Sequence, residues 1–381
     1  MSKSFFYGRH LIDKKDIRSV TKSLESSLSQ GPILEKFEKE VSRFFGSKYC
    51  VAFSSATAAL HVAIASLKLK KNSNAFTSAM TFVATPNSCI YNNLKPNLID
   101  INEDDYNINL DLLEQKLSKL KKRDKKLILP VHFGGLPCDM SRIKKIAKKY
   151  NCHVIEDASQ AMGSKFNNSY VGNSSSDAII FSLHPVKSIT SGEGGLMLTN
   201  STKIFKKAKL LRSHGLVRYK KKHWKSNMIE LGYNYKITEF QCALGLSQLK
   251  KLKNFITKRN QIAKYYKSKL KNPGIIFQKY NNNKYLHSYH YFIVKFKKKI
   301  SSLKMNSLIE NLKKKNIFLG RQYLPIHQHS FYSKIFKKKF VIADKYFDQS
   351  VQLPIYPSLS LKDLKYVTKM FKSAINKEKI I

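Results

Sequence analysis

The sequence contains no long apolar run and few cysteines. No segment has the roughly 20 consecutive apolar residues that a membrane-spanning helix needs, and residues 1–10 lack the apolar core of a signal peptide. The five cysteines are odd in number and include no CxxC pair, so they predict neither a disulfide framework nor a metal site. We therefore expect a cytoplasmic protein with no membrane association and no bound metal.

Acidic residues are also scarce. The chain has 25 Asp+Glu against 70 Lys+Arg, a formal net charge of +45, and a surface this basic attracts polyanions. Nucleic-acid binding is therefore a competing interpretation. The lysines, however, are spread along the chain in short runs, and no zinc-finger spacing or RNA-recognition signature is present. We expect no nucleic-acid partner, because AT-rich coding would give the same composition, and an anionic nucleotide substrate is compatible with it.

No GxGxxG fingerprint follows a predicted strand, which disfavours a dinucleotide-binding dehydrogenase. A length of 381 residues is sufficient for a large domain with a sizeable core and a smaller second domain. Short apolar strands alternate with helical patterns, which predicts an α/β fold with a mostly parallel sheet. The expected helices are 14–27, 34–45, 56–67, 110–120, 141–150, 203–211, 238–266, 302–315 and 361–374, and the expected strands are 50–53, 98–101, 127–131, 154–155, 177–181, 196–198 and 289–296. The lysine-rich segment around Trp224 is expected to be a loop.

Two polar side chains follow predicted strands. Asp157 is the second residue after strand 154–155, and Lys187 lies in the turn after strand 177–181. Open α/β sheets bind ligands at such strand ends. Lysine forms Schiff bases with carbonyl substrates and with pyridoxal phosphate (PLP), and PLP needs an acidic partner at its ring nitrogen. Asp157 and Lys187 are candidates for these two roles, although a strand-end Asp or Lys on its own is more often a solvated turn residue.

The turn at Ser54 and Ser55 joins strand 50–53 to a helix of small and apolar residues. Such a junction exposes free backbone N–H groups at the start of the helix, and these can hold a phosphate. A plain serine N-cap is the alternative interpretation.

Three segments resemble the signature of a known family: EDASQA at 156–161, FSLHPVK at 181–187 and GEGG at 192–195. The family is that of the PLP-dependent nucleotide-sugar aminotransferases, the DegT/DnrJ/StrS group. Segments 30–38, 51–61, 231–236 and 241–245 match it in order and spacing, and the resemblance is weakest after about residue 270. It implies PLP-dependent transferase fold type I, with a large PLP-binding domain at 1–250 and a smaller α+β domain at 251–381, on which the N-terminal segment packs.

The resemblance also implies roles for single residues. Lys187 is the catalytic residue, and Asn234 reaches the phosphate in the neighbouring subunit, which implies a homodimer with shared active sites. The remaining cofactor contacts implied are Ala56, Thr57 and Ser182 at the phosphate, Phe82 stacked on the ring, Asp157 at the ring nitrogen and Gln160 on the side of the ring hydroxyl. Tyr7, Tyr323 and His327 are the candidate substrate contacts, with core packing as the alternative.

Within the family, TFVAT at 81–85, GLPCDM at 135–140 and HPVK at 184–187 are most similar to the C4 aminotransferases of the pseudaminic acid pathway. The similarity implies transfer of an amino group from L-glutamate to the C4 keto group of a UDP-linked 4-keto-6-deoxy-HexNAc sugar, with Lys187 moving the proton. Enzymes acting at C3 or C4 of other keto-sugars, of the perosamine or bacillosamine type, share the cofactor motifs. They remain an alternative, as does a PLP-binding member without turnover. Sister dehydratases carry histidine in place of the lysine, so their chemistry is not expected.

Overall fold

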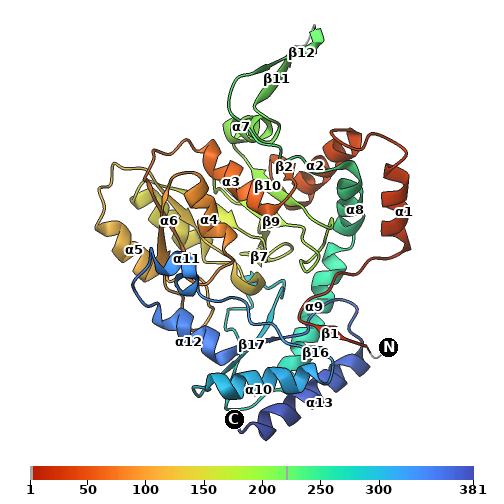
Figure 1. Ribbon diagram of the computed structural model, residues 1–381, viewed down its shortest axis with the longest axis vertical. Helices are drawn as coiled ribbons and strands as arrows, with labels where there is room; N and C mark the ends of the chain where they lie inside the picture. Colours follow the sequence, from red (N-terminus) through yellow and green to blue (C-terminus); the bar gives the residue numbers. More distant parts are fainter. Residues whose placement is uncertain (1–2, 220–221) are drawn as a thin grey trace.

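The computed structural model describes residues 3–219 and 222–381 and is built around one central sheet (Figure 1). The sheet has seven strands in the order β2-β10-β9-β6-β5-β3-β4. Their bounds are β2 (Tyr49–Phe53), β3 (Asn74–Ser78), β4 (Lys95–Ile99), β5 (Lys126–Leu129), β6 (Cys152–Asp157), β9 (Ala178–Ser182) and β10 (Gly195–Thr199). Strand β10 is antiparallel to both of its neighbours, and the other pairings are parallel. The predicted α/β fold with a mostly parallel sheet is confirmed.

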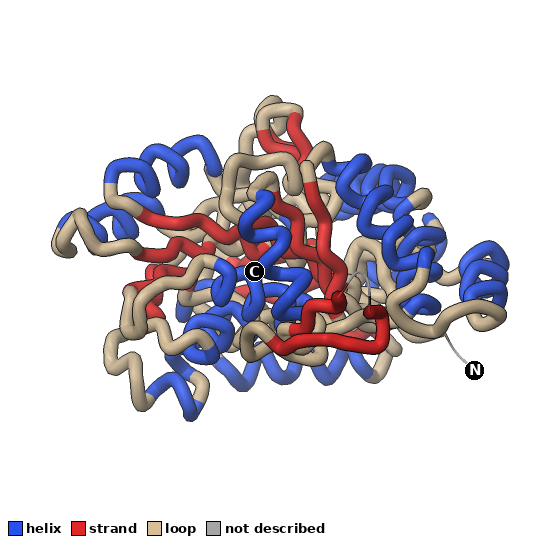
Figure 2. Tube along the Cα trace, turned by 90° about the horizontal axis from the view of Figure 1, so that it is seen from above, coloured by secondary structure: helices blue, strands red, loops and turns tan. Residues whose placement is uncertain are grey.

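Helices cover both faces of this sheet, because successive side chains of a strand point to opposite faces. Cys50 and Ala52 of β2 pack in one apolar cluster with residues of α2 (Pro32–Phe45), α8 (Glu239–Leu249) and α9 (Leu252–Lys269). Val51 and Phe53 pack in another with residues of α3 (Ala56–Ser66) and α7 (Thr202–Arg212). Figure 2 shows strands in the middle of the molecule with helices around them. The helices of this part are α1 (Lys14–Ser23), α2 (Pro32–Phe45), α3 (Ala56–Ser66), α4 (Ala84–Tyr91), α5 (Leu110–Ser118), α6 (Met140–Lys149), α7 (Thr202–Arg212) and α8 (Glu239–Leu249).

The C-terminal part begins with α9 (Leu252–Lys269) and has an apolar core of its own, which includes Tyr266, Val294 and Phe371. Phe5 belongs to this core as well, because β1 (Phe5–Phe6) pairs in parallel with β16 (Ile317–Phe318). The other elements are β13 (Ile275–Ile276), β14 (Tyr285–Leu286), β15 (Phe292–Phe296), β17 (Ser350–Leu353), α10 (Ser302–Lys313), α11 (Ser330–Ser333), α12 (Val341–Gln349) and α13 (Leu361–Lys377). The break between α8 and α9 lies at residues 250–251, and the division into two domains there stays a prediction.

Two predictions of local structure are wrong. The single helix expected over 238–266 is two helices, and the break lacks a Gly or Pro that would have revealed it. At the break, Lys251 is held by ion pairs to Asp13 and Asp16, at 2.7 and 2.6 Å. The expected loop around Trp224 forms an antiparallel hairpin, β11 (Leu216–Tyr219) and β12 (Lys222–Met228), which projects from the body of the molecule (Figure 1). Its tip, residues 220–221, lies outside the described residues.

The sequence reading also missed β3 and α4. Strand β3 is an interior strand that pairs with both β4 and β5. None of the described helices combines the length and the apolar character that a bilayer-spanning segment requires.

Candidate active site

A cavity of about 620 Å³ opens where strands β6 and β9 end and helix α3 begins. It is closed on the other side by residues from the C-terminal part, including Tyr291 and Arg321. The sequence-predicted residues that line it are Tyr7, Ala56, Thr57, Phe82, Asp157, Gln160, Ser182, Lys187 and Tyr323. The fold therefore brings together residues that are more than 300 positions apart in the chain.

Lys187 lies in the turn that follows β9, and its backbone N–H donates to the carbonyl oxygen of His184 at 2.9 Å. Its side chain is partly open to the cavity and is otherwise surrounded by protein. This burial lowers the pKa of the Lys187 amine from 10.5 to about 8, and the nearby carboxylates of Asp157 and Glu193 oppose the shift only in part. Lys187 can therefore lose its proton near neutral pH, as a nucleophilic or proton-accepting amine must.

Asp157 is the last residue of β6, and its side chain is buried. Its Oδ2 accepts a hydrogen bond from the Thr85 hydroxyl at 2.6 Å, and its Oδ1 accepts one from the backbone N–H of Ser159 at 3.1 Å. No Lys, Arg or His among the described residues forms a salt bridge with it. A buried carboxylate without a cationic partner suits a ligand that brings its own positive charge.

The start of α3 forms another part of the cavity wall. The Ser55 hydroxyl caps the helix by accepting from the N–H of Ala58 at 3.1 Å, so the serine N-cap expected as the alternative is present. The cap uses the N–H of Ala58 and leaves those of Ala56 and Thr57, which come before the first intrahelical hydrogen bonds, available to an anion. Ser182, which also lines this cavity, adds a hydroxyl group.

Gly195 allows β10 to approach the turn at Ser55 and Ala56 closely. A Cβ atom at Gly195 would lie 2.3 Å from the carbonyl oxygen of Ser55 and 2.5 Å from the backbone nitrogen of Ala56. Real side chains do not tolerate such contacts with backbone atoms, so only glycine fits here. The last glycine of the GEGG segment therefore determines the shape of the candidate phosphate site.

Aromatic and amide groups form the remaining walls. Gln160 Oε1 accepts from the N–H of Gly134 at 2.7 Å, and its Nε2 lies 3.5 Å from the Tyr323 hydroxyl. The Phe82 side chain is 52% exposed, and its ring centroid lies 5.6 Å from that of Tyr323. An apolar ring that is open to a polar cavity can stack on a flat ligand.

Two predicted residues lie outside this cavity. Asn234 is exposed and forms an isolated bridge with Ser213 near the base of the β11–β12 hairpin. His327 is buried and pairs through Nε2 with Asp344 Oδ1 at 2.9 Å, with its ring against Phe340. The structure therefore gives His327 a packing environment in the C-terminal part, and a role for Asn234 would require a second subunit.

The arrangement agrees with the comparisons with known proteins. The sequence model of the DegT/DnrJ/EryC1/StrS aminotransferase family matches residues 10–372. The chain belongs to this family. The resemblance noted in the sequence is thereby confirmed, and the family is PLP-dependent.

Individual relatives of this aminotransferase cover almost its whole length. The UDP-4-amino-4,6-dideoxy-N-acetyl-beta-L-altrosamine transaminase of Campylobacter jejuni (serotype O:23/36, strain 81-176) is 37% identical over 376 residues, 98% of each chain. The structure of Helicobacter pylori PseC, an aminotransferase involved in the biosynthesis of pseudoaminic acid, matches with a TM-score of 0.91 and 28% identity, over 98% of this chain and 100% of that one. Spr1654 of Streptococcus pneumoniae, solved in its PLP form, has a TM-score of 0.91 at 24% identity, over 99% of this chain and 100% of that one, and supports the fold alone.

The sequence reading missed several residues of the aminotransferase site that come from the C-terminal part. His290 is buried, and its Nε2 lies 3.5 Å from Lys187 Nζ. Burial and the nearby Lys187 keep the pKa of His290 well below its usual range, so its imidazole is neutral. Tyr291 donates to or accepts from the Tyr323 hydroxyl at 2.8 Å, and Arg321 supplies a cation to the cavity wall. These residues follow position 270, where the motif match is weakest, so no local signal indicated them.

Proposed function

We propose that this aminotransferase uses PLP to transfer an amino group from L-glutamate to the C4 keto group of a UDP-linked 4-keto-6-deoxy-HexNAc sugar, in surface-glycan biosynthesis of the pseudaminic acid type. The observation that carries the proposal is the convergence on one cavity of a lysine with a lowered pKa, a buried carboxylate without a cationic partner and a free helix N-terminus. The altrosamine transaminase and PseC relatives support the choice of substrate.

The residues fit PLP at each of its functional groups. The first N–H groups of α3 and the Ser182 hydroxyl would hold the phosphate, Asp157 the ring nitrogen, and Phe82 the ring face. Lys187 would hold the aldehyde carbon. When bound, PLP supplies the electron sink that lets the donor's Cα–H bond break.

The protein's own contribution is to position groups and to move a proton. The amine of Lys187, with its pKa near 8, can accept a proton at Nζ and return it at a neighbouring atom. The buried Asp157 carboxylate, fixed by Thr85 and Ser159, holds a positive charge in place without having to reorient. Tyr7, Tyr323 and Arg321 form the outer wall, where an anionic nucleotide sugar would contact them.

The proposal includes a homodimer with shared sites. Asn234 lies outside the cavity of its own subunit, and the hairpin β11–β12 projects from the body of the molecule (Figure 1). The hairpin and the segment after it expose large apolar side chains, including Trp224, Met228 and Leu231, which are 80%, 61% and 77% exposed. Apolar groups gathered on a projecting element are typical of an interface.

An absorption spectrum of the purified protein incubated with PLP, recorded before and after addition of L-glutamate, tests the proposal. We expect a band near the visible edge that glutamate removes and that Lys187→Ala lacks. Incubation of the glutamate-treated enzyme with UDP-4-keto sugars, followed by mass and NMR analysis of the product, then identifies the aminated carbon. An amine at C3, or on a different sugar nucleotide, would favour the alternative substrates. No band with PLP would refute the proposal.

A further inference from the structure

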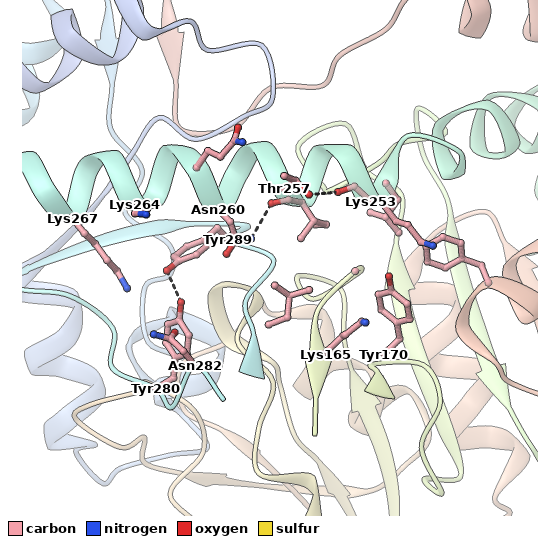
Figure 3. Close-up of a pocket in the computed structure, with 16 residues that line it drawn as sticks. Lys165, Tyr170, Lys253, Thr257, Asn260, Lys264, Lys267, Tyr280, Asn282 and Tyr289 are labelled. Atoms are coloured by element: carbon pink, nitrogen blue, oxygen red, sulfur yellow. Dashed lines mark hydrogen bonds between the residues drawn. The ribbon is translucent and has the colours of Figure 1, made fainter. Parts of the chain in front are cut away.

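A second cavity, of about 750 Å³, lies between α9, the hairpin of β7 (Lys165–Phe166) and β8 (Ser169–Tyr170), and the segment 280–289 (Figure 3). It shares no lining residue with the active-site cavity. Its volume lies in the usual range of small-molecule sites, about 300 to 1,000 Å³. It is therefore large enough to hold a ligand of its own.

The charges around this second cavity are all positive. Lys165, Lys253, Lys264 and Lys267 line it, and no carboxylate does. None of these four lysines forms a salt bridge within the described part of the chain. Figure 3 shows Lys264 and Lys267 on the α9 wall and Lys165 on the facing hairpin. Cations on opposite walls of one hollow produce a positive potential that attracts an anion.

Lys267 is held in a specific position. Its Nζ lies 5.1 Å from the centroid of the Tyr280 ring and 5.7 Å from that of Tyr289, and the two tyrosine hydroxyls are hydrogen-bonded at 2.6 Å (Figure 3). Burial lowers the pKa of Lys267. A lysine present only because of codon composition would extend into water, whereas this one is partly desolvated beside two rings and has no counter-ion.

The same cavity has an apolar side. Phe44, Leu252, Ile256 and Leu286 line it together with the two tyrosines. A ligand that matches this lining carries several negative charges together with a flat or apolar group. We propose that this cavity is a regulatory site for a nucleotide that carries a di- or triphosphate group.

We infer a regulatory role for this ligand because one chain segment, residues 289–291, contributes to both cavities. Tyr289 lines the second cavity, the next residue, His290, contacts Lys187, and Tyr291 lines the active site. The Tyr289 ring is stacked on His287 with centroids 4.0 Å apart. A ligand that packs on Tyr289 therefore restrains the segment that carries His290. This part of the inference depends on the proposed role of Lys187, whereas binding at the cavity does not.

Binding is tested by titration calorimetry of the PLP-loaded protein with ATP, in about 0.15 M salt to screen weak surface attraction. The variant is Lys264→Ala/Lys267→Ala, and the control with the same charge change is Lys337→Ala/Lys338→Ala, at exposed lysines outside both cavities. We expect one ATP per chain in the wild type and the control, and binding at least tenfold weaker in the variant. Absence of saturable binding, or equal binding in all three proteins, would overturn the proposal.

Hydrogen exchange followed by mass spectrometry tests the connection and needs no cofactor. ATP should slow exchange in residues 285–291 of the wild type and the control, and leave the Lys264→Ala/Lys267→Ala variant unchanged. ATP binding without slower exchange in this segment would overturn the regulatory role. Because this readout does not depend on absorption by PLP, it distinguishes failure of this inference from failure of the proposed function.

Discussion

The Nζ atom of Lys187 lies 3.5 Å from Nε2 of His290, a residue 103 positions later in the chain. His290 is buried and neutral, and its Nδ1 has no hydrogen-bond partner among the described residues. Lys187, in the turn after β9, is thus packed against a side chain from the C-terminal part. This contact helps to exclude water from the amine and so contributes to its lowered pKa.

Cofactor uptake should depend on pH through Lys187. The amine attacks a carbonyl only when it is deprotonated, and its pKa is about 8. The rate at which the apoprotein takes up PLP should therefore rise with pH, with a midpoint near 8, and fall about tenfold per pH unit below it. Stopped-flow absorption over pH 6 to 10 measures this, and a midpoint near that of an exposed lysine would contradict the burial argument.

Replacing His290 should raise the pH midpoint of PLP uptake. In His290→Ala, water enters the space beside Lys187, and the ammonium form becomes less costly. We expect the pH midpoint of PLP uptake to move toward the ordinary lysine value, with a smaller shift in His290→Gln, which keeps a polar group of similar reach. Equal midpoints in the wild type and His290→Ala would show that the contact has no effect on the amine.

Removing the charge of Asp157 should lower both kcat and the pH midpoint of PLP uptake. In Asp157→Asn the cofactor nitrogen loses its ionic partner, and we expect kcat to fall by at least about 10²-fold. The carboxylate also raises the pKa of Lys187, so the midpoint of PLP uptake should fall. As a control, Thr85→Val removes only the hydroxyl that donates to Asp157 and should reduce kcat less. An Asp157→Asn enzyme with normal kcat would refute the proposed role of Asp157 at the cofactor's ring nitrogen.

The close approach of Gly195 to Ser55 and Ala56 predicts that a larger residue at position 195 reduces stability and cofactor binding. Gly195→Ala places a Cβ against the backbone of Ser55 and Ala56, so the turn before α3 must move. We expect a loss of about 1 to 3 kcal/mol in the free energy of unfolding and weaker binding of PLP, measured by urea unfolding and by cofactor titration. Gly8→Ala, whose Cβ would make only ordinary contacts at 3.4 Å or more, is the control and should change neither.

Shared active sites can be tested by mixing two inactive variants. If Asn234 serves the neighbouring subunit, a heterodimer of Lys187→Ala and Asn234→Ala chains contains one intact site, because the second chain supplies the lysine and the first supplies the asparagine. Refolding the two variants together should restore activity that neither has alone. If Asn234 acts within its own subunit, the mixture stays as inactive as its components.

Much of the large sheet could be predicted from the sequence, and so could several residues that line the cavity. Asp157 ends strand β6, Lys187 lies in the turn after strand β9, and Ala56 and Thr57 begin a helix of small residues, so strand ends and helix starts indicated them. The break between α8 and α9 could not be predicted, because helical periodicity continues through it and the ion pairs of Lys251 are tertiary contacts.

The sequence by itself determined the α/β fold and the family motifs, because the spacing of apolar side chains along a strand or helix and the residues of a short motif are local features. Only the tertiary structure decided which residues of the C-terminal part enter the site. It placed His290, Tyr291 and Arg321 beside the cavity and His327 in a buried pair with Asp344. These neighbours depend on how one apolar core packs on another, and nothing in the spacing of residues along a strand or helix records that packing.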